Sequence, residues 1–337
     1  MTVLHLTEQR ALVRRDGETL VVQFLREPDG TRRPKVVVPL QKIEQVVVHG
    51  DVTLTTPAIH ALLESGVEIA YLAWNGRLQG RLAGELSKNG PLREAQHIAH
   101  ADPAVRLNFA RRFVGGKLAN MRTMLLRAQR SSPNARLAQA AERIAVQLAG
   151  MNDVASIASL LGGEGSGSAA YFGVFGLLVK QNFTFPRRRR RPPTDPVNAL
   201  LSFGYSQLSN AMSGAASVAG LDPYLGMLHS TVYGRPAAAL DLMEEFRPLI
   251  VDSVVLSVSN NRVLDASSFE EDLGAYRLTT SARKSFLAQY EARMNTEVQH
   301  PVFGYRATYR RCLDLQARLL AKAITGDIPA YPPFIVR

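Results

Sequence analysis

The chain has 337 residues, of which 46% are hydrophobic and 20% charged, with 40 Lys and Arg against 29 Asp and Glu. This composition is that of a globular protein long enough for two domains, and it excludes a low-complexity chain. The formal net charge of +11 and the pI near 10.0 favour a polyanionic partner, with nucleic acid first. An anionic membrane is the competing partner, but the sequence lacks a basic amphipathic helix with a bulky aromatic face.

Cysteine usage and the N-terminus bear on where the protein works. The single cysteine, Cys312, excludes an internal disulfide framework and fits a reducing cytosol. The N-terminus lacks the charged-then-apolar layout of a signal peptide. The longest apolar run, residues 169–179, is about half of a membrane span. We therefore expect a cytoplasmic protein without a membrane-spanning segment.

Short β-branched runs indicate strands in the first part of the chain. The expected strands are a hairpin over residues 11–24 and single strands over 35–40, 45–49 and 67–72. Asp16-Gly17 provides the hairpin turn. Residues 56–65 interrupt the pattern as a short helix, which Thr56 can cap and in which Pro57 suits the first position.

The hydrophobic period becomes helical after Pro91. Asp102 and Pro103 form a helix start, because a capping carboxylate precedes a proline. Apolar residues then recur at helical spacing to about Arg130, and a second helix is expected over residues 135–148. The predicted fold class is α+β, with a β-rich domain over residues 1–88 and a larger all-α domain over residues 89–337.

Two segments interrupt the helical part. Residues 160–170 are small residues around a single acid, Glu164, which four flanking glycines leave open to a close neighbour, a ligand or a metal. The alternative is a glycine-rich helix junction with a solvent-facing Glu. Residues 187–191 are five consecutive arginines between prolines, so the segment is expected to be an exposed loop. It either clamps a DNA backbone or is simply solvated.

A second group of candidate residues follows Gly226. His229 precedes a helix restart at Pro236, and Asp241 and Glu244 share a face of the helix that follows. Arg247 extends this face. Taken singly, these residues read as a structural histidine and a surface salt-bridge ladder. Taken together with Glu164, they offer the hard oxygen ligands and the imidazole that suit Mg²⁺ or Mn²⁺.

Four motifs in order carry a resemblance to a known family. They are LLGGEG at residues 160–165, PVNALLSFGY at 196–205, LDPYLGMLH at 221–229 and LDLMEEFRPLIVD at 240–252. Together they closely resemble the universal CRISPR-associated endonuclease/integrase family ("Cas-one"). The resemblance extends over nearly the whole chain, although Gly167 and Ser168 replace the double alanine usual after Glu164.

The resemblance implies a homodimer that binds DNA and a small companion CRISPR adaptation protein ("Cas-two"). It implies one divalent metal, Mg²⁺ or Mn²⁺, held by Glu164, His229 and Glu244, with Asp241 as a further catalytic acid. The implied reaction is metal-dependent transesterification of spacer 3′-OH ends onto repeat phosphodiesters, together with nuclease activity. The DNA-contacting residues expected with it are Arg187, Arg188, Arg189, Arg190, Arg191, Asn198, Ser202, Tyr205 and Arg247.

Two other functions stay open at this stage. One is a noncatalytic DNA-binding scaffold, against which the retention of all candidate ligands argues. The other is a hydrolytic nuclease for branched DNA in repair, which differs from an integrase only in its nucleophile. The sequence also leaves open whether the C-terminal segment from Ala330 onward docks a partner or packs on the protein. Asn198, Ser202 and Tyr205, which recur at helical spacing, either face the site or form a polar seam inside a helix.

Overall fold

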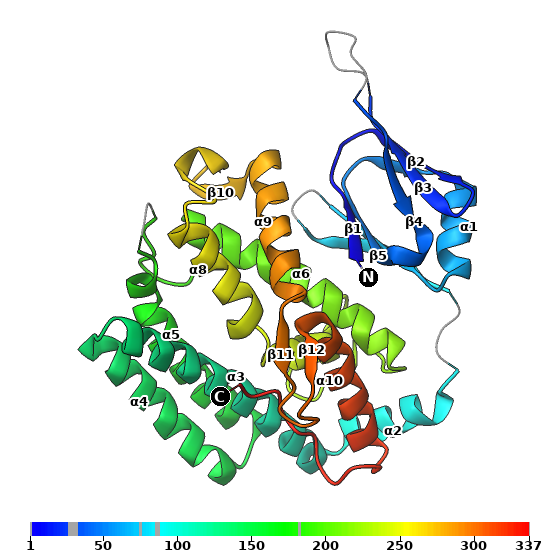
Figure 1. Cartoon of the computed structure of the whole chain (residues 1–337). Helices are drawn as coiled ribbons and strands as arrows, with labels where there is room; N and C mark the ends of the chain where they lie inside the picture. The colour runs from blue at the N-terminus through cyan, green and yellow to red at the C-terminus, as the bar shows by residue number, and fades with distance from the viewer. Residues whose placement is uncertain (1, 26–32, 74–75, 85–87, 181–182, 337) are drawn as a thin grey trace. The chain divides into compact units, whose positions relative to one another are not determined.

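The computed structural model describes residues 2–25, 33–73, 76–84, 88–180 and 183–336 (Figure 1). The chain divides into two compact units, residues 1–86 and 87–337. Each unit has its own hydrophobic core. No helix among the described residues is long and apolar enough to cross a membrane.

In its described residues, the first unit has two four-stranded sheets and one α-helix. Its elements are β1 (Thr2–Leu6), β2 (Ala11–Asp16), β3 (Thr19–Gln23), β4 (Val36–Pro39), β5 (Ile43–His49), β6 (Val52–Leu54), α1 (Thr56–Glu64), β7 (Glu68–Leu72) and β8 (Leu78–Leu82). One sheet has the order β1-β5-β7-β8 and the other β4-β3-β2-β6. Strands β1, β5 and β7 are parallel, and β2, β3 and β4 form an antiparallel meander.

The predicted hairpin and short helix are present in this unit. Strands β2 and β3 pair from Leu12 to Gln23, and Gly17 adopts a φ of +56° in the turn between them. Helix α1 begins at Thr56 and has Pro57 in its first turn, but its cap is Thr55, whose extended backbone precedes the helix. The prediction that Thr56 caps α1 was therefore wrong by one residue.

The second unit is built from nine α-helices in its described part. These are α2 (Gly90–Ala101), α3 (Pro103–Ser131), α4 (Ala135–Ala149), α5 (Ile157–Phe175), α6 (Pro196–Val218), α7 (Ala237–Met243), α8 (Ser253–Asn260), α9 (Thr280–Met294) and α10 (Tyr309–Ile324). The Asp102 carboxylate accepts hydrogen bonds from the backbone N–H groups of Ala104 and Val105, so it caps α3 as the sequence predicts.

Two short hairpins distinguish this unit from the expected all-α domain. Strands β9 (Phe269–Asp272) and β10 (Ala275–Leu278) pair antiparallel, as do β11 (Glu297–Gln299) and β12 (Arg306–Thr308). Each strand of these hairpins is only three or four residues long, and most of the residues are exposed. Their sequences therefore show little of the alternation of apolar and polar residues from which strands are predicted.

Helices α3, α4 and α5 pack side by side (Figure 1). Helix α5 runs unbroken through the glycine-rich segment, so the expected interruption at residues 160–170 was wrong. A Cβ at Gly167 would lie 2.6 Å from Leu118 Cδ2, and a Cβ at Gly163 would lie 3.2 Å from Gln147 Oε1. These glycines are therefore spacers that let α5 approach α3 and α4 within a regular helix.

The segment after α7 leaves regular helical geometry. Helix α7 ends at Met243, residues 244–247 form turns, and η4 (Pro248–Asp252) is a π-helix that continues into α8. The face that Asp241, Glu244 and Arg247 were expected to share on one helix thus passes into a turn. π-Helical turns often lie at functional sites because they redirect side chains from the regular helical stripe.

Candidate active site

Glu164 lies in the middle of α5 and faces α3. Its Oε1 accepts a hydrogen bond from Ser168 Oγ at 2.7 Å and forms an ion pair with Lys117 Nζ. The side chain of Glu164 retains 19% exposure, whereas that of Lys117 retains only 5%. The carboxylate is thus held in place on one side and open on the other.

The His229 loop is held by the buried carboxylate of Asp241. The backbone N–H groups of Met227, Leu228 and His229 donate to Asp241 at 2.5, 2.9 and 2.9 Å. Gly226 permits this approach, because a Cβ there would lie 2.7 Å from Ala237 Cβ and 2.9 Å from Asp241 Oδ2. Asp241 therefore fixes the loop against the start of α7.

Asp241 also orients the His229 ring. His229 Nδ1 lies 2.7 Å from Asp241 Oδ1. Because a carboxylate oxygen accepts, the ring proton is on Nδ1, and the lone pair of the neutral ring is left on Nε2. Nε2 lies 3.7 Å from Glu244 Oε1. This is the arrangement by which an outer carboxylate orients a metal-binding imidazole. Asp241 is thus suited to position His229 rather than to be a ligand itself.

Glu244 is the buried acid on the Nε2 side of the His229 ring. Lys117 Nζ lies 2.7 Å from its Oε2, and Arg247 Nη2 lies 3.1 Å from its Oε1. Burial opposes ionisation, but Arg247, Lys117 and His229 outweigh it and lower the pKa of Glu244 to about 2. Within the part of the chain that the structure describes, Oε2 has no hydrogen-bond partner beyond the ion pair with Lys117. The group is therefore an ionised carboxylate with a free lone pair.

Lys117 on α3 is a candidate site residue that the sequence does not single out. Its ammonium lies between Glu164 and Glu244 and forms ion pairs with both. A signal for it exists, because Phe113, Lys117 and Met121 are spaced by four residues along the buried stripe of α3. A lysine at a buried position of this kind almost always pairs with acids.

No three His, Cys, Asp or Glu side chains among the described residues already lie close enough to hold a metal ion. The reason is visible in the ion pairs, since the Lys117 ammonium stands between the two glutamates. His229 Nε2 lies 3.7 Å from Glu244 Oε1, and Lys117 forms ion pairs with both Glu244 and Glu164. The predicted ligands therefore converge on one place, which a cation of the protein itself partly fills.

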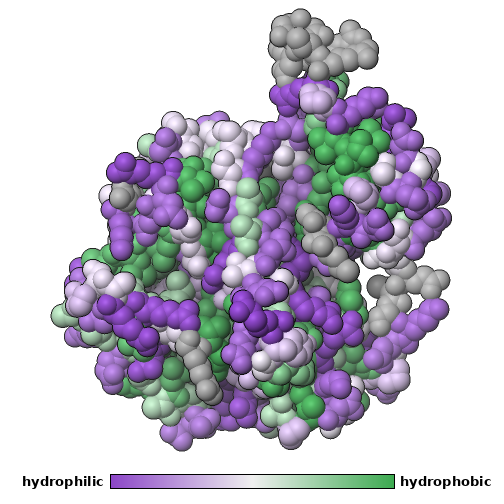
Figure 2. Space-filling model, in the orientation of Figure 1, coloured by the Kyte–Doolittle hydropathy of each residue, from purple (hydrophilic) through white to green (hydrophobic). Residues whose placement is uncertain are grey.

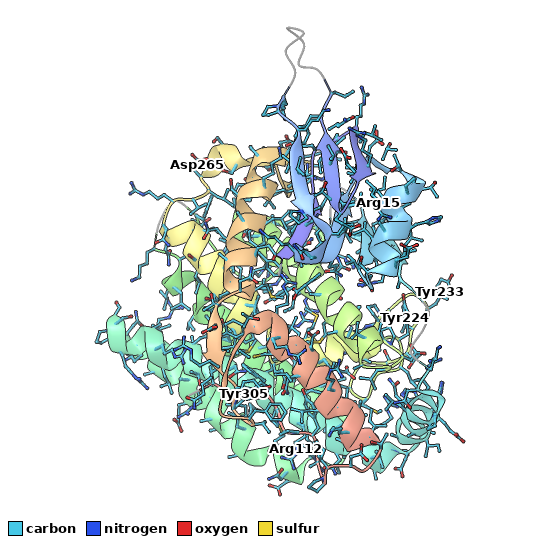
Figure 3. All side chains as sticks on the ribbon, turned by 45° about the vertical axis from the view of Figure 1, so that its right-hand side comes forward. Arg15, Arg112, Tyr224, Tyr233, Asp265 and Tyr305 are labelled. Carbon is cyan, nitrogen blue, oxygen red and sulfur yellow. The ribbon has the colours of Figure 1, made fainter. Side chains whose placement is uncertain are left out.

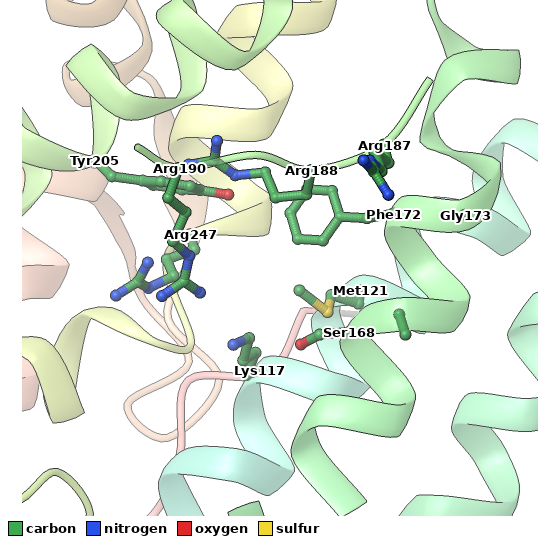
Figure 4. A pocket seen from close by; sticks show the side chains of 11 residues that line it. Lys117, Met121, Ser168, Phe172, Gly173, Arg187, Arg188, Arg190, Tyr205 and Arg247 are labelled. Atoms are coloured by element: carbon green, nitrogen blue, oxygen red, sulfur yellow. The ribbon is translucent and has the colours of Figure 1, made fainter. Parts of the chain in front are cut away.

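Beside Lys117 opens a basic cavity of about 350 Å³ (Figure 4). It is lined by Lys117, Met121, Ser168, Ala169, Phe172, Gly173, Arg187, Arg188, Arg190, Tyr205 and Arg247. Figure 4 shows Lys117 and Ser168 on the opposite wall from Tyr205 and the arginine loop, with Arg247 between them. The cavity has the charge to hold phosphate groups next to the glutamates.

The Tyr205 ring supports two of these arginines. The guanidinium carbons of Arg188 and Arg247 lie 5.5 and 4.9 Å from the ring centroid, within range of cation–π attraction. Tyr205 donates its hydroxyl to Asp252 Oδ1 at 2.5 Å, and Tyr171 donates to Oδ2 at 3.0 Å. Burial raises the pKa of Asp252 to about 6 despite these donors. Tyr205 therefore serves as a platform, and its hydroxyl is occupied.

The arginine loop is more ordered than its composition suggests. Asn198 Oδ1 accepts from Arg188 Nη1 at 2.7 Å and from the Arg189 N–H at 2.8 Å, and Asn198 Nδ2 donates to the Arg187 carbonyl. Ser202 Oγ lies 3.4 Å from both terminal nitrogens of Arg188. Arg188 is thus held partly buried, whereas the other four arginines are exposed, as the sequence predicts for this loop.

These contacts revise two of the expected DNA contacts. Asn198 is fully buried, and both of its amide atoms are used by the loop and by Asp195. It therefore holds the arginine loop rather than a phosphate. Ser202 does the same through Arg188. Of the five arginines, Arg187, Arg188 and Arg190 line the cavity, whereas Arg189 and Arg191 are exposed outside it.

A strand-rich unit is thus followed by a helical unit in which two glutamates and an imidazole lie beside an arginine-lined cavity, an arrangement suited to binding a polyanion next to an acidic centre. The family model described as "CRISPR associated protein Cas1" matches residues 4–292. The chain therefore belongs to the Cas1 family, as the motif resemblance predicts.

Relatives and solved structures agree with this assignment. A protein from Thermus thermophilus named CRISPR-associated endonuclease Cas1 3 is 39% identical over 339 residues, covering 99% of this chain and 97% of that protein. A Cas4 exonuclease/Cas1 endonuclease fusion from Geobacter sulfurreducens is 40% identical over 342 residues, covering 99% of this chain and 60% of the fusion. The chain thus spans little more than half the length of this fusion relative.

Two solved structures share the fold. A casposase bound to its integration product superimposes with a TM-score of 0.83 at 25% identity, covering 97% of this chain and 92% of that chain. A Cas1 protein from Thermotoga maritima gives a TM-score of 0.80 at 22% identity, covering 97% of each chain. The predicted α+β fold class is therefore confirmed.

Proposed function

We propose that this chain is a divalent-metal-dependent DNA endonuclease and integrase of CRISPR adaptation. The observation that carries the proposal is the juxtaposition, across Lys117, of two glutamates and a histidine with an arginine-lined cavity. The names of its relatives as endonucleases, and the integration product bound by the casposase, support the same reaction class. The whole chain, residues 89–337 above all, would carry this chemistry.

The donor set fits a hard divalent cation. Glu164, Glu244 and the Nε2 atom of His229 would hold Mg²⁺ or Mn²⁺, because carboxylate oxygens are hard ligands and one imidazole favours Mn²⁺. The free lone pair of buried Glu244 Oε2 supports this fit. When bound, the ion would polarise a phosphodiester and stabilise negative charge on its oxygens. Asp241 would keep Nε2 directed at the site.

The chain's own groups would bind and align the DNA. Arg188 and Arg247, fixed on Tyr205, would hold the phosphates in line with the glutamates. In strand joining, a 3′-hydroxyl oxygen forms a new P–O bond, and the target strand's P–O bond breaks to release a new 3′-hydroxyl. In hydrolysis, water replaces the first hydroxyl. Tyr205 is not expected to be a nucleophile, because its hydroxyl donates to Asp252.

The partners are proposals of the same kind. One structural neighbour, 25% identical, is a Cas6-RT-Cas1–Cas2 complex, which supports a Cas2-type companion. The integration product bound by the casposase supports DNA as a partner. The first unit would make the dimer and companion contacts. Its exposed apolar side chains include Leu12, Val36 and Val37, and Figure 2 shows hydrophobic surface on the visible face of this unit. DNA as substrate and the single cysteine favour the cytoplasm.

A strand-joining assay tests this function. The protein and its companion would be incubated with a short duplex, a supercoiled plasmid carrying the repeat, and Mg²⁺ or Mn²⁺. We expect joined products with the wild type. Glu164→Ala and His229→Ala should remove them while leaving DNA binding intact, because neither residue is among those that line the arginine cavity.

Glu142→Ala on the exposed face of α4 is the matched control, because it removes one acid without touching the site. It should join DNA like the wild type. Joining that survives both site substitutions would reject the metal assignment. DNA binding without products under either metal would favour the noncatalytic scaffold, and cleavage of branched DNA without joining would favour a repair nuclease.

A further inference from the structure

The C-terminal strap, residues 331–336, is an extended segment that packs into the core of the helical unit. It follows α10 and lies beyond residues 4–292, which the family model matches. Tyr331 and Phe334 are among the fully buried side chains of the unit. The Phe334 ring stacks against Phe246 at a centroid distance of 4.9 Å. The strap therefore packs on the turn that follows α7.

The anchor of the strap is the buried carboxylate of Glu245. Tyr331 Oη and Gln316 Nε2 donate to Glu245 Oε1 at 2.5 and 2.9 Å, and the Phe334 N–H donates to Oε2 at 2.8 Å. Three donors on one fully buried carboxylate make a rigid connection. Glu245 is the chain neighbour of Glu244, so this connection ends one residue from the candidate ligand.

Asn120 on α3 joins the same three parts. Its Nδ2 donates to the carbonyls of Glu245 and Phe334 at 2.8 and 2.7 Å, and its Oδ1 accepts from the Val336 N–H at 3.0 Å. Asn120 is fully buried and lies one helical turn after Lys117. The strap thus bridges α3 and the turn at residues 244–247.

The backbone of α3 touches this connection directly. A Cβ at Gly116 would lie 3.0 Å from Pro333 Cβ and 3.1 Å from both Glu245 Cβ and Oε2. Gly116 immediately precedes Lys117. The strap is therefore in contact with the chain neighbours of both Lys117 and Glu244, whose side chains form an ion pair in the site.

We infer that the C-terminal strap positions the turn at residues 244–247, with Glu245 as a positioning residue for Glu244 and Lys117. Residues 244–247 keep only part of the helical hydrogen-bond ladder, because two of the backbone bonds back to α7 span three residues instead of four. Contacts from outside the turn therefore add to its placement. Glu245, Asn120 and Phe334 provide those contacts. The inference rests on the proposed function, since it assigns the strap to the same metal site.

Two variants of the full chain loosen the strap by different amounts. In Glu245→Gln, one side-chain oxygen becomes an N–H donor, which must face the donor of either Gln316 or Phe334. Tyr331→Phe removes two hydrogen bonds, the one that the hydroxyl donates to Glu245 and the one that it accepts from Gln316, and keeps the buried ring. Tyr290→Phe is the matched control, because Tyr290 is equally buried and its hydroxyl has no partner within the described part of the chain.

The test measures the dissociation constant for Mn²⁺ by calorimetry, and kcat and KM for strand joining, well below the melting temperature of each variant. We expect Glu245→Gln to weaken Mn²⁺ binding and to lower kcat by about tenfold or more, with KM for DNA little changed. Tyr331→Phe should show a smaller effect in the same direction, and Tyr290→Phe none. A merely structural strap would lower the melting temperature without moving these constants.

Mn²⁺ affinity and kcat within twofold of wild type in both strap variants would overturn the inference, whatever their melting temperatures. If Glu245→Gln does not fold, the comparison of Mn²⁺ affinity and kcat between Tyr331→Phe and Tyr290→Phe decides the test. A wild type that joins no DNA would instead reject the proposed function. The Mn²⁺ comparison would still test the strap in that case.

Discussion

The two walls of the site hold their charges in different ways. On the glutamate wall, Glu244 and Lys117 are almost fully buried and neutralise each other. On the arginine wall, Arg188 and Arg247 rest on the Tyr205 ring beside an open cavity. Fully buried charges demand partners at fixed distances, whereas cations that border an open cavity can also pair with a bound polyanion. The difference separates the groups suited to chemistry from those suited to binding.

Removing Lys117 should produce the largest change on the glutamate wall. Lys117→Met leaves two carboxylates facing each other without their shared cation, so we expect a loss of about 3 kcal/mol in the free energy of unfolding without metal. Saturating Mn²⁺ should recover most of this loss, because the ion replaces the ammonium. Thermal unfolding with and without Mn²⁺ measures it. An equal loss under both conditions would mean that Lys117 is only a packing residue.

The buried acid behind the arginine wall predicts a pH dependence. Burial raises the pKa of Asp252 from 3.8 to about 6, so the folded state holds an extra proton between these values. The stabilisation that the protonated Asp252 gives to the folded state is therefore complete below about pH 4 and is lost as the pH rises to about 6. The free energy of unfolding changes by about 3 kcal/mol over this range. Asp252→Asn should flatten this part of the stability curve in chemical denaturation at pH 4, 5 and 6.

Burial raises the pKa of Glu245 to about 7, so this residue also makes the protein less stable as the pH rises, over a higher pH range than Asp252. Glu245 is still present in the Asp252→Asn variant. The wild type and variant should therefore converge in slope above pH 6. An unchanged slope between pH 4 and 6 in Asp252→Asn would show that Asp252 does not titrate there.

Arginines of the cavity should matter more for DNA binding than their exposed neighbours. Arg188→Ala or Arg247→Ala should weaken duplex binding by about tenfold and reduce the slope of log affinity against log salt by about one. Arg189→Ala, in the same loop but outside the cavity, should weaken it by less. Arg112, exposed on α3 and labelled in Figure 3, is the remote control. Equal effects at all four positions would indicate a general effect of positive charge and would contradict a specific role for the arginines that line the cavity.

The smallest expected effect separates two glycines of α5. A Cβ at Gly162 meets nothing within 4 Å, whereas a Cβ at Gly167 collides with Leu118. Gly162→Ala should therefore stabilise the protein by about 0.5–1 kcal/mol through helix propensity. Gly167→Ala should destabilise it by about 1 kcal/mol or more, because α3 must shift. Denaturant unfolding measures both, and stabilisation by both would show that α5 does not pack tightly at Gly167.

Much of the fold follows from local signals in the sequence. The hairpin at Gly17 and the Asp102 cap are encoded by neighbouring residues, so short-range rules found them. The unbroken course of α5 was missed because glycines weaken a helix locally, and only packing against Leu118 explains their presence. The hairpins β9–β10 and β11–β12 are too short and too exposed to show a period.

Part of the candidate site was also predictable from the sequence. Glu164, His229 and Glu244 came from motifs, and the structure brings the last two within 3.7 Å of each other. Their role as metal ligands stays a prediction. Lys117 and Asp252 were missed because their roles depend on partners about 47 residues or more away in sequence. Exposed Tyr224 and Tyr233, on the loop around His229, remain without an assigned role (Figure 3).

Electron paramagnetic resonance of bound Mn²⁺ tests the central claim most directly. Titration of the wild type should reveal one tightly bound ion per chain whose spectrum carries coupling to an imidazole nitrogen. Glu164→Ala and Glu244→Ala should each weaken binding strongly, and His229→Ala should abolish the nitrogen coupling. A nitrogen coupling that persists in His229→Ala, or Mn²⁺ binding that all three substitutions leave unchanged, would contradict the account.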